Sequence, residues 1–324
     1  MKAPYSPVVL EGQVVARALA ILVVVATHAS SWTIGGGMLT LLFISGYNFI
    51  MFSRGKSNSQ LAIYCLKYTK NIVLPSVAII CMYFIWYQKF SAAEILHYSN
   101  WVGTTSIAWM PVWYPSMILQ VMALLTAIFL IFRPTRFIED HSCKFCVVSF
   151  IVACLLYILS DVLVEAELAA ADARLPFSYL WCFTLGWLAY SIHKSENAWL
   201  LPGFIILTAV SAAVFISWQS KHEALVFVPL VTLFLYNPKL QVPQILYSVF
   251  SVLAGASLYI FLFHMSFFYV YHTLTGWRHE ETSFHLAMFS FSVVGCCVMW
   301  LVFTSGRKAW LETKRNLEGF RREV

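Results

Sequence analysis

The first apolar stretch of the chain contains an arginine and a histidine with ten residues between them: Arg17 and His28, at the two ends of the segment RALAILVVVATH. A charged side chain inside a membrane span costs about 2.5–3.5 kcal/mol on insertion scales. Eleven steps of about 100° end within about 20° of three full helical turns, so both side chains project from one helix face, about 16 Å apart along its axis. This face offers a fixed cation and, further along, an imidazole that exchanges protons near neutral pH.

A second histidine, His264, falls at a matching depth in a later apolar stretch. By the helical rise, His28 lies about 24 Å and His264 about 21 Å from the inner ends of their spans. Both therefore belong to the outer half of a hydrocarbon core about 30 Å thick, while Arg17 lies near its inner surface. All 15 Asp and Glu residues fall outside the apolar stretches or at their ends. The histidines are thus the candidate proton-transfer groups at that depth.

The composition fixes the kind of element that must position these residues. Of 324 residues, 60% are hydrophobic and 11% are charged, against about 25% charged in a soluble domain. We therefore expect an all-α, polytopic membrane protein that forms a single transmembrane domain over residues 1–324. About ten apolar runs are long enough to cross the membrane: residues 13–33, 38–53, 72–89, 112–132, 145–160, 176–193, 199–218, 223–236, 247–271 and 284–304.

The basic residues predict the orientation. With the N-terminus inside, 16 Lys and Arg residues fall in cytoplasmic segments and 4 in external ones, namely Lys89, Arg174, Lys221 and Arg278. The positive-inside rule then places both termini in the cytoplasm, including a basic tail at about 306–324. The net charge of +6 follows this topology, so we expect membrane lipids and no nucleic acid as partners.

Two further stretches invite interpretation. The basic segment 54–70 is predicted to be an amphipathic helix at the membrane surface, where its lysines contact anionic headgroups or the phosphates of a ligand. Cys143 and Cys146 have the two-residue spacing of a metal site but lack a second pair, so we expect no metal.

Four more short motifs follow the Arg17–His28 pair in order along the chain. They are LFISGY at 42–47, VWYP at 112–115, FTLG at 183–186 and SLYIFLFH at 257–264. In this order the motifs resemble those of the acyltransferase-3 family of integral membrane O-acyltransferases, which modify bacterial surface glycans. The chain departs from that family in the fourth span, where many members carry a glutamate and this sequence has Ser116 and Gln120.

The resemblance implies a fold and a reaction. Ten spans with cytoplasmic termini are expected in a bacterial cytoplasmic (inner) membrane. The enzyme would move an acyl group, most often acetyl, from cytoplasmic acetyl-CoA to a hydroxyl of a glycan or lipid-linked sugar on the outer side. Arg17 would hold a phosphate of the acyl-CoA, and Tyr259 and Trp113 would line the path of the donor.

Roles in the reaction follow from the same resemblance. His28 would act as general base, and His264 would orient the acceptor, stabilise the oxyanion or share the base role. Direct transfer needs no nucleophilic serine, although Ser45 is available for a two-step variant.

Other functions remain open at this point. The main alternative is an exporter or flippase of a glycan or lipid-linked sugar, but the spans lack the carboxylates and clear inverted repeats of many transporters. A membrane-bound O-acyltransferase of the unrelated MBOAT type also uses a membrane histidine, but the early position of the Arg17–His28 pair argues against it. A non-catalytic scaffold would leave Arg17 unexplained.

Overall fold

A computed structural model describes most of the chain. The described residues are 7–29, 34–87, 92–102, 113–135, 138, 142–166, 175–195, 197, 199–216, 222–275 and 282–323, and the side chains of 86–87, 102 and 307–323 are not described. The basic residues of the predicted topology that lie outside these ranges are Lys2, Lys89, Arg136, Arg174, Lys221 and Arg278.

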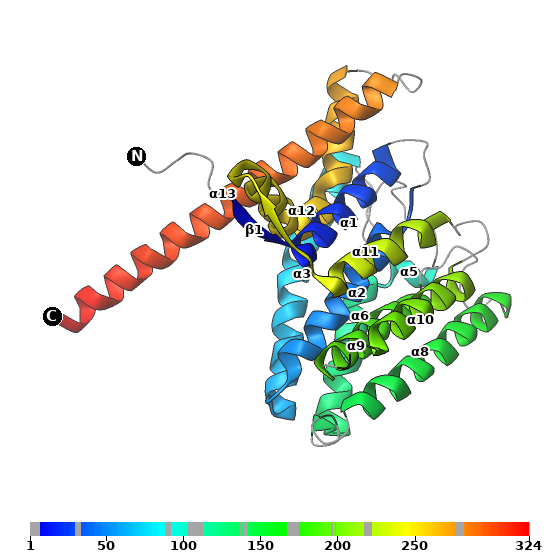
Figure 1. The fold of residues 1–324 in the computed structure, drawn as a ribbon. Coiled ribbons are helices and arrows are strands. Elements are labelled where there is room, and N and C mark those ends of the chain that lie inside the picture. Colours follow the sequence, from blue (N-terminus) through cyan, green and yellow to red (C-terminus); the bar gives the residue numbers. More distant parts are fainter. Residues whose placement is uncertain are drawn as a thin grey trace.

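Helix α1 (Gly12–Ala29), which carries Arg17 and His28, packs against four other described helices. It packs against helices from both ends of the chain (Figure 1). Alanine and valine dominate its sequence, and its small buried side chains let neighbours approach closely. These neighbours are α2 (Gly37–Ser53), α11 (Ala224–Tyr236), α12 (Gln244–Thr275) and α13 (Thr282–Glu323).

The remaining helices form two groups on either side of α2. One group pairs α3 (Asn58–Tyr87) with α6 (Trp113–Ile131), joined through the short α4 (Ala92–Ile95) and α5 (Ser99–Val102). The other comprises α8 (Ser142–Glu165), α9 (Phe177–Lys194) and α10 (Leu200–Phe215), which lie side by side (Figure 1).

The helices have the lengths and composition of a membrane protein. Six are long and apolar enough to cross a membrane: α1, α3, α6, α8, α12 and α13. Three shorter apolar helices, α2, α10 and α11, and the 18-residue α9 cover the other predicted runs. The expectation of an all-α membrane protein is therefore confirmed at this level, with each of the ten predicted runs overlapping a helix.

The basic segment 54–70 differs from its prediction. Helix α3 begins at Asn58 and continues without interruption to Tyr87, and Asn58–Ile85 is apolar enough to span a membrane. The segment is thus mostly the first turns of a helix that is long enough to cross a membrane, rather than a separate surface helix. Its polar residues are spaced widely enough to leave Leu61, Ala62 and Cys65 buried.

Helices α2 and α9 touch backbone to backbone through two glycines. A Cβ added to Gly46 would lie 1.9 Å from the carbonyl oxygen of Phe183, and one added to Gly186 would lie 2.2 Å from that of Phe43. Only glycine permits this approach. The first and third of the four short motifs therefore meet in space, because these glycines belong to LFISGY and FTLG.

A two-stranded antiparallel sheet joins distant parts of the chain. Strand β1 (Val8–Glu11) precedes α1, and β2 (Lys239–Val242) connects α11 to α12, with Glu11 opposite Lys239. Sequence analysis did not anticipate it, because four-residue strands carry too little periodicity to stand out. The pairing fixes the start of α1 beside the end of α11, where the backbone N–H of Gly12 donates to the carbonyl oxygen of Pro238.

Candidate functional site

The two candidate catalytic histidines meet. His28 is near the end of α1 and His264 is in the middle of α12, and their ring centroids are 5.3 Å apart with planes tilted by 35°. His28 is exposed, whereas His264 is completely buried. The ring of His285 in α13 also bonds to the carbonyl oxygen of Ala29, next to His28. One imidazole thus faces outward and the other lies behind it.

Hydrogen bonding assigns the proton of neutral His264. Its Nδ1 lies 2.9 Å from the carbonyl oxygens of both Ile260 and Phe261, one turn earlier in α12. A carbonyl only accepts, so Nδ1 carries the proton and Nε2 presents a lone pair. Within the described residues, this Nε2 is buried and has no hydrogen-bond partner. Neutral His264 can therefore accept a proton but cannot donate one to an oxyanion through Nε2.

Arg17 lines a cavity of about 210 Å³ between α1, α2, α3, α6 and α12. Its polar walls comprise Ser45, Tyr68, Asn71, Tyr114 and Ser257, and none of the lining residues is acidic. The Nε of Arg17 is buried, and no described residue accepts a hydrogen bond from it. A buried donor without a partner is costly. The cavity thus offers a cationic donor to an anionic or strongly accepting group.

The tyrosines of this cavity converge on Ser45. Its side chain lines the same cavity as the Tyr68 and Tyr114 side chains, and both phenols are close enough to Arg17 to interact with its charge. Ser45 itself donates to the carbonyl oxygen of Leu41 at 2.8 Å. Since this bond uses the only proton of the hydroxyl, Ser45 can only accept hydrogen bonds from other groups in the cavity.

A proline modifies the wall formed by α3. Pro75 stands within the helix and has no N–H, so it cannot bond to the carbonyl oxygen of Asn71, four residues earlier. Asn71 lines the Arg17 cavity. The carbonyl group of Asn71 therefore lacks its usual helical donor, and it belongs to a residue that lines the same cavity as Arg17.

The arginine cavity and the histidine pair share a wall. Phe261 lines the cavity, and its ring centroid lies 6.2 Å from that of His264. It also packs against Tyr114, at 4.3 Å between centroids. Arg17 and His28 therefore both lie on the side of α1 that faces α12. Arg17 lines the cavity, and His28 lies beyond it towards the end of α1. This makes the two parts one candidate site.

Two other candidate donor-binding residues lie around this site rather than in the cavity. The ring of Tyr259 packs on Phe263 and, in α13, on Phe303, with centroids 6.3 and 5.8 Å apart. Trp113 contacts Tyr114 at 6.1 Å and Tyr179 of α9 at 5.5 Å. Neither is among the residues that line the Arg17 cavity. Trp113 adjoins it through Tyr114.

Ser116 and Gln120, where the sequence departs from the acyltransferase-3 pattern, hold a buried polar network. The two ring nitrogens of His97 lie 3.2 Å from the Ser116 hydroxyl and 3.3 Å from that of Ser76. Gln120 donates to the carbonyl oxygen of His97 and accepts from the indole of Trp101. Burial lowers the pKa of His97, which lies between spans. The network attaches α4 and α5 to α3 and α6.

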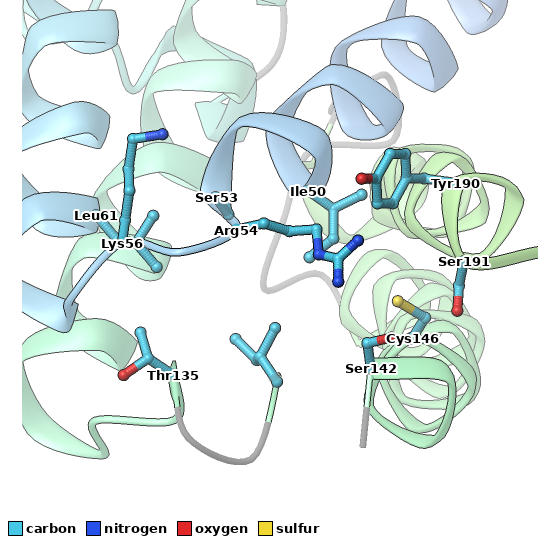
Figure 2. A pocket seen from close by; sticks show the side chains of 11 residues that line it. Ile50, Ser53, Arg54, Lys56, Leu61, Thr135, Ser142, Cys146, Tyr190 and Ser191 are labelled. Carbon is cyan, nitrogen blue, oxygen red and sulfur yellow. The ribbon is translucent and has the colours of Figure 1, made fainter. Parts of the chain in front are cut away.

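A small cavity lies at the other end of α2. The guanidinium of Arg54 points into it beside Tyr190 and Ser142, while Lys56 points elsewhere (Figure 2). Its volume is about 20 Å³, which is room for about one water molecule. It is too small to be a substrate site.

Sequence reasoning identified the charged members of the site but missed most of its polar walls. Tyr68, Asn71, Tyr114 and Ser257 come from three helices, and only the packing of those helices brings them to Arg17. Tyr114 and Ser257 did carry a signal, because they belong to the quoted motifs VWYP at 112–115 and SLYIFLFH at 257–264. In the described part of the chain, no three His, Cys, Asp or Glu side chains gather in a metal-binding arrangement.

The chain matches no family model, no curated protein and no solved structure. The site geometry and the order of the short motifs are therefore the basis for a functional assignment.

Proposed function

We propose that the chain is a membrane O-acyltransferase. It transfers an acyl group, most often acetyl, from cytoplasmic acyl-CoA to a hydroxyl of a cell-envelope glycan or lipid-linked sugar on the outer side of a bacterial inner membrane. The observation that carries this proposal is the His28–His264 pair, 5.3 Å between ring centroids, directly adjoining the cavity of Arg17. A proton acceptor thus lies next to a pocket suited to an anionic donor.

The residues around Arg17 suit the donor. Acyl-CoA carries phosphates at one end and a thioester at the other, joined by a long flexible arm. The buried, unpartnered Nε of Arg17 and the absence of acidic side chains among the lining residues favour a phosphate group there. The rise along α1 from Arg17 to His28 is about 16 Å. The arm can therefore extend along α1 and α12 towards the histidines.

The histidines supply the proton transfer. His28 is exposed and takes the proton of the acceptor hydroxyl as its oxygen attacks the thioester carbonyl carbon. The carbon–sulfur bond breaks, and the departing thiolate takes a proton from the imidazolium, which leaves an acyl ester and free CoA. His264, with its lone pair on a buried Nε2, positions His28 or shares its proton. The Ser45 hydroxyl proton is already donated to Leu41, which favours direct transfer.

The proposal includes ten membrane crossings with both termini in the cytoplasm. Pairing of β1 with β2 brings the start of α1 and the end of α11 to the same side. An even number of crossings between them satisfies this, and eight helices supply it: α1, α2, α3, α6, α8, α9, α10 and α11. Two more, α12 and α13, then return the C-terminus to the inside.

The acyl-to-sugar ratio of surface glycans tests the proposal. Cells that express the wild-type chain or variants at matched levels are compared by mass analysis of their glycans. Removing a positioned general base commonly costs about 10²- to 10⁴-fold in rate, so His28→Ala should leave the glycans unacylated. His264→Ala should lower the ratio by a similar or smaller factor.

His193→Ala is a matched control, because His193 lies at the other end of the molecule and bonds to Tyr47. Its ratio should equal that of the wild type. A wild-type ratio in His28→Ala would overturn the catalytic role. Variants that change the amount of surface glycan with an unaltered ratio would instead support an exporter.

A further inference from the structure

A second cavity opens at the ends of helices on the His28 side of the molecule. It has a volume of about 200 Å³ and lies between α2, α8, α9, α10 and the start of α11. Leu39, in the first turn of α2, lines it, and α2 follows α1 directly after the His28 end. In the topology proposed above, this is the outer side. We call it the outer pocket.

The outer pocket combines carboxylates with aromatic rings. Asp161 of α8 and Glu223, which precedes α11, supply the carboxylates. Its aromatic walls comprise Tyr157, Tyr179, Trp181 and Phe215. The rings pair with one another, at 5.1 Å for Tyr157–Phe215 and 5.3 Å for Trp181–Phe215. They therefore form a continuous apolar wall with acceptors at its margin.

This chemistry selects a neutral sugar. Carboxylates accept strong hydrogen bonds from hydroxyl groups, and aromatic rings pack on the apolar C–H face of a pyranose. No Lys or Arg is among the lining residues, so an acidic sugar or a phosphate would be repelled by the carboxylate of Asp161 and would find no basic side chain in the lining. The volume is below the roughly 300–1,000 Å³ of sites for drug-sized ligands, which fits a single ring.

Ring contacts connect the outer pocket to the histidine pair. Tyr179 of its wall contacts Trp113, Trp113 contacts Tyr114, Tyr114 contacts Phe261, and Phe261 contacts His264. Centroid separations along this series lie between 4.3 and 6.2 Å. A Cβ on Gly35, in the connection after α1, would also collide with the Glu223 side chain. The pocket is therefore connected to the candidate reaction centre through packed rings without being part of it.

We propose that the outer pocket binds one neutral sugar unit of the acceptor glycan, away from the unit whose hydroxyl is acylated. This inference rests on the proposed function in one respect, namely that the bound sugar belongs to an acceptor glycan. The selectivity of the pocket for a neutral sugar follows from its own residues. Asp161 and Glu223 accept hydroxyl protons, and the wall of Tyr157 and Phe215 packs on the ring. Such a subsite holds a long glycan while a neighbouring unit reaches His28.

Direct binding to the purified full chain in nanodiscs tests the inference. Saturation-transfer NMR is recorded with chitotetraose, maltotetraose and mannotetraose as neutral probes, and with tetragalacturonate and choline as comparators. We expect at least one neutral probe to bind and neither comparator to compete with it. Asp161→Asn should weaken that binding by about 10-fold or more, the value of one charge-assisted hydrogen bond. Glu223→Gln provides a second, independent removal of charge.

Glu165→Gln is the matched control, since Glu165 is one turn beyond Asp161 on α8, is exposed and does not line the pocket. It should bind as the wild type does. The inference is overturned if no neutral probe binds, if Asp161→Asn and Glu223→Gln both bind like the wild type, or if tetragalacturonate or choline binds in their place. The last outcome would identify an acidic-sugar or a quaternary-ammonium site.

The same samples separate this inference from the proposed function. If His28→Ala keeps Asp161-dependent sugar binding and surface glycans carry no acyl groups even with the wild-type chain, the enzyme proposal fails and the sugar site stands. If acylation depends on His28 but sugar binding does not depend on Asp161 or Glu223, the sugar site fails alone.

Discussion

Arg17 combines a positive charge with a planar group that donates several hydrogen bonds in a fixed geometry. Its Nε is buried beside a cavity with hydroxyl and amide walls. A lysine at this position would keep the charge and lose the fork of donors. The residue thus allows charge and geometry to be tested separately.

We predict that Arg17→Lys weakens acetyl-CoA binding by about 10- to 150-fold, which corresponds to the loss of about 1.5–3 kcal/mol from a hydrogen bond to a charged group. Calorimetric titration of the purified protein measures this affinity. Arg54→Lys is the control, because Arg54 lines a separate cavity with room for about one water molecule. Unchanged binding in Arg17→Ala would restrict Arg17 to a role in topology.

His97 predicts a pH dependence. Burial lowers the pKa of His97 in the folded state below its usual 6.5. The unfolded chain therefore binds the proton more readily, and stability is lost as the pH falls below about 6.5. We expect the thermal unfolding midpoint in detergent to drop more between pH 7.5 and 5.5 for the wild type than for His97→Gln. Equal drops would show that protonation of His97 does not contribute.

Sequence and structure agree best where one helix decides the geometry. The spacing of Arg17 and His28 depends only on the helical repeat, and α1 is a continuous helix. The depth argument paired His28 with His264 because both spans begin at the same surface. Tyr68, Asn71 and Tyr114 could not be found this way, since their contribution depends on which helices are neighbours. A single sequence does not contain that information in its periodicity.

At the scale of helices, the contact between α2 and α9 depends on two small residues. Gly46 and Gly186 come from motifs far apart in the chain, and each lies against the backbone of the other helix. The sequence offered both motifs as marks of a resemblance. The structure gives them a physical reason, which is the close approach of two helix backbones.

We predict that Gly186→Ala destabilises the protein by about 1–3 kcal/mol, because the added Cβ meets the Phe43 carbonyl group and the helices must separate. Gly203→Ala in α10 is the matched control, since a Cβ there meets nothing within 4 Å. Thermal unfolding of both variants in the same detergent measures the difference. Equal midpoints would contradict the requirement for a glycine.

At the scale of the whole molecule, the proposed topology places every candidate residue relative to the membrane. It puts Arg17 towards the donor side and His28 and the outer pocket towards the acceptor side. An inverted chain would exchange these assignments. The topology is therefore a condition of the proposed reaction.

Reporter fusions test this topology. Fusions at Lys56, Lys194, Lys239 and the C-terminus should read as cytoplasmic, and fusions near Asp172 and Glu281 as external; Asp172 and Glu281 lie outside the described residues. Alkaline phosphatase and green fluorescent protein report the two sides. An external C-terminus would refute the ten-crossing arrangement and reverse the side assigned to Arg17.

The pairing of β1 with β2 also sets an order of events during synthesis. Val8 pairs with Val242, so β1 cannot pair with β2 until about 230 further residues have been synthesised. At about 5–20 residues per second, this takes roughly 10–50 s. For that time the first helix, which carries Arg17 and His28, has neither its strand partner nor α12 beside it. The site is thus completed late in translation, after the eight helices proposed to cross the membrane before α12 have been made.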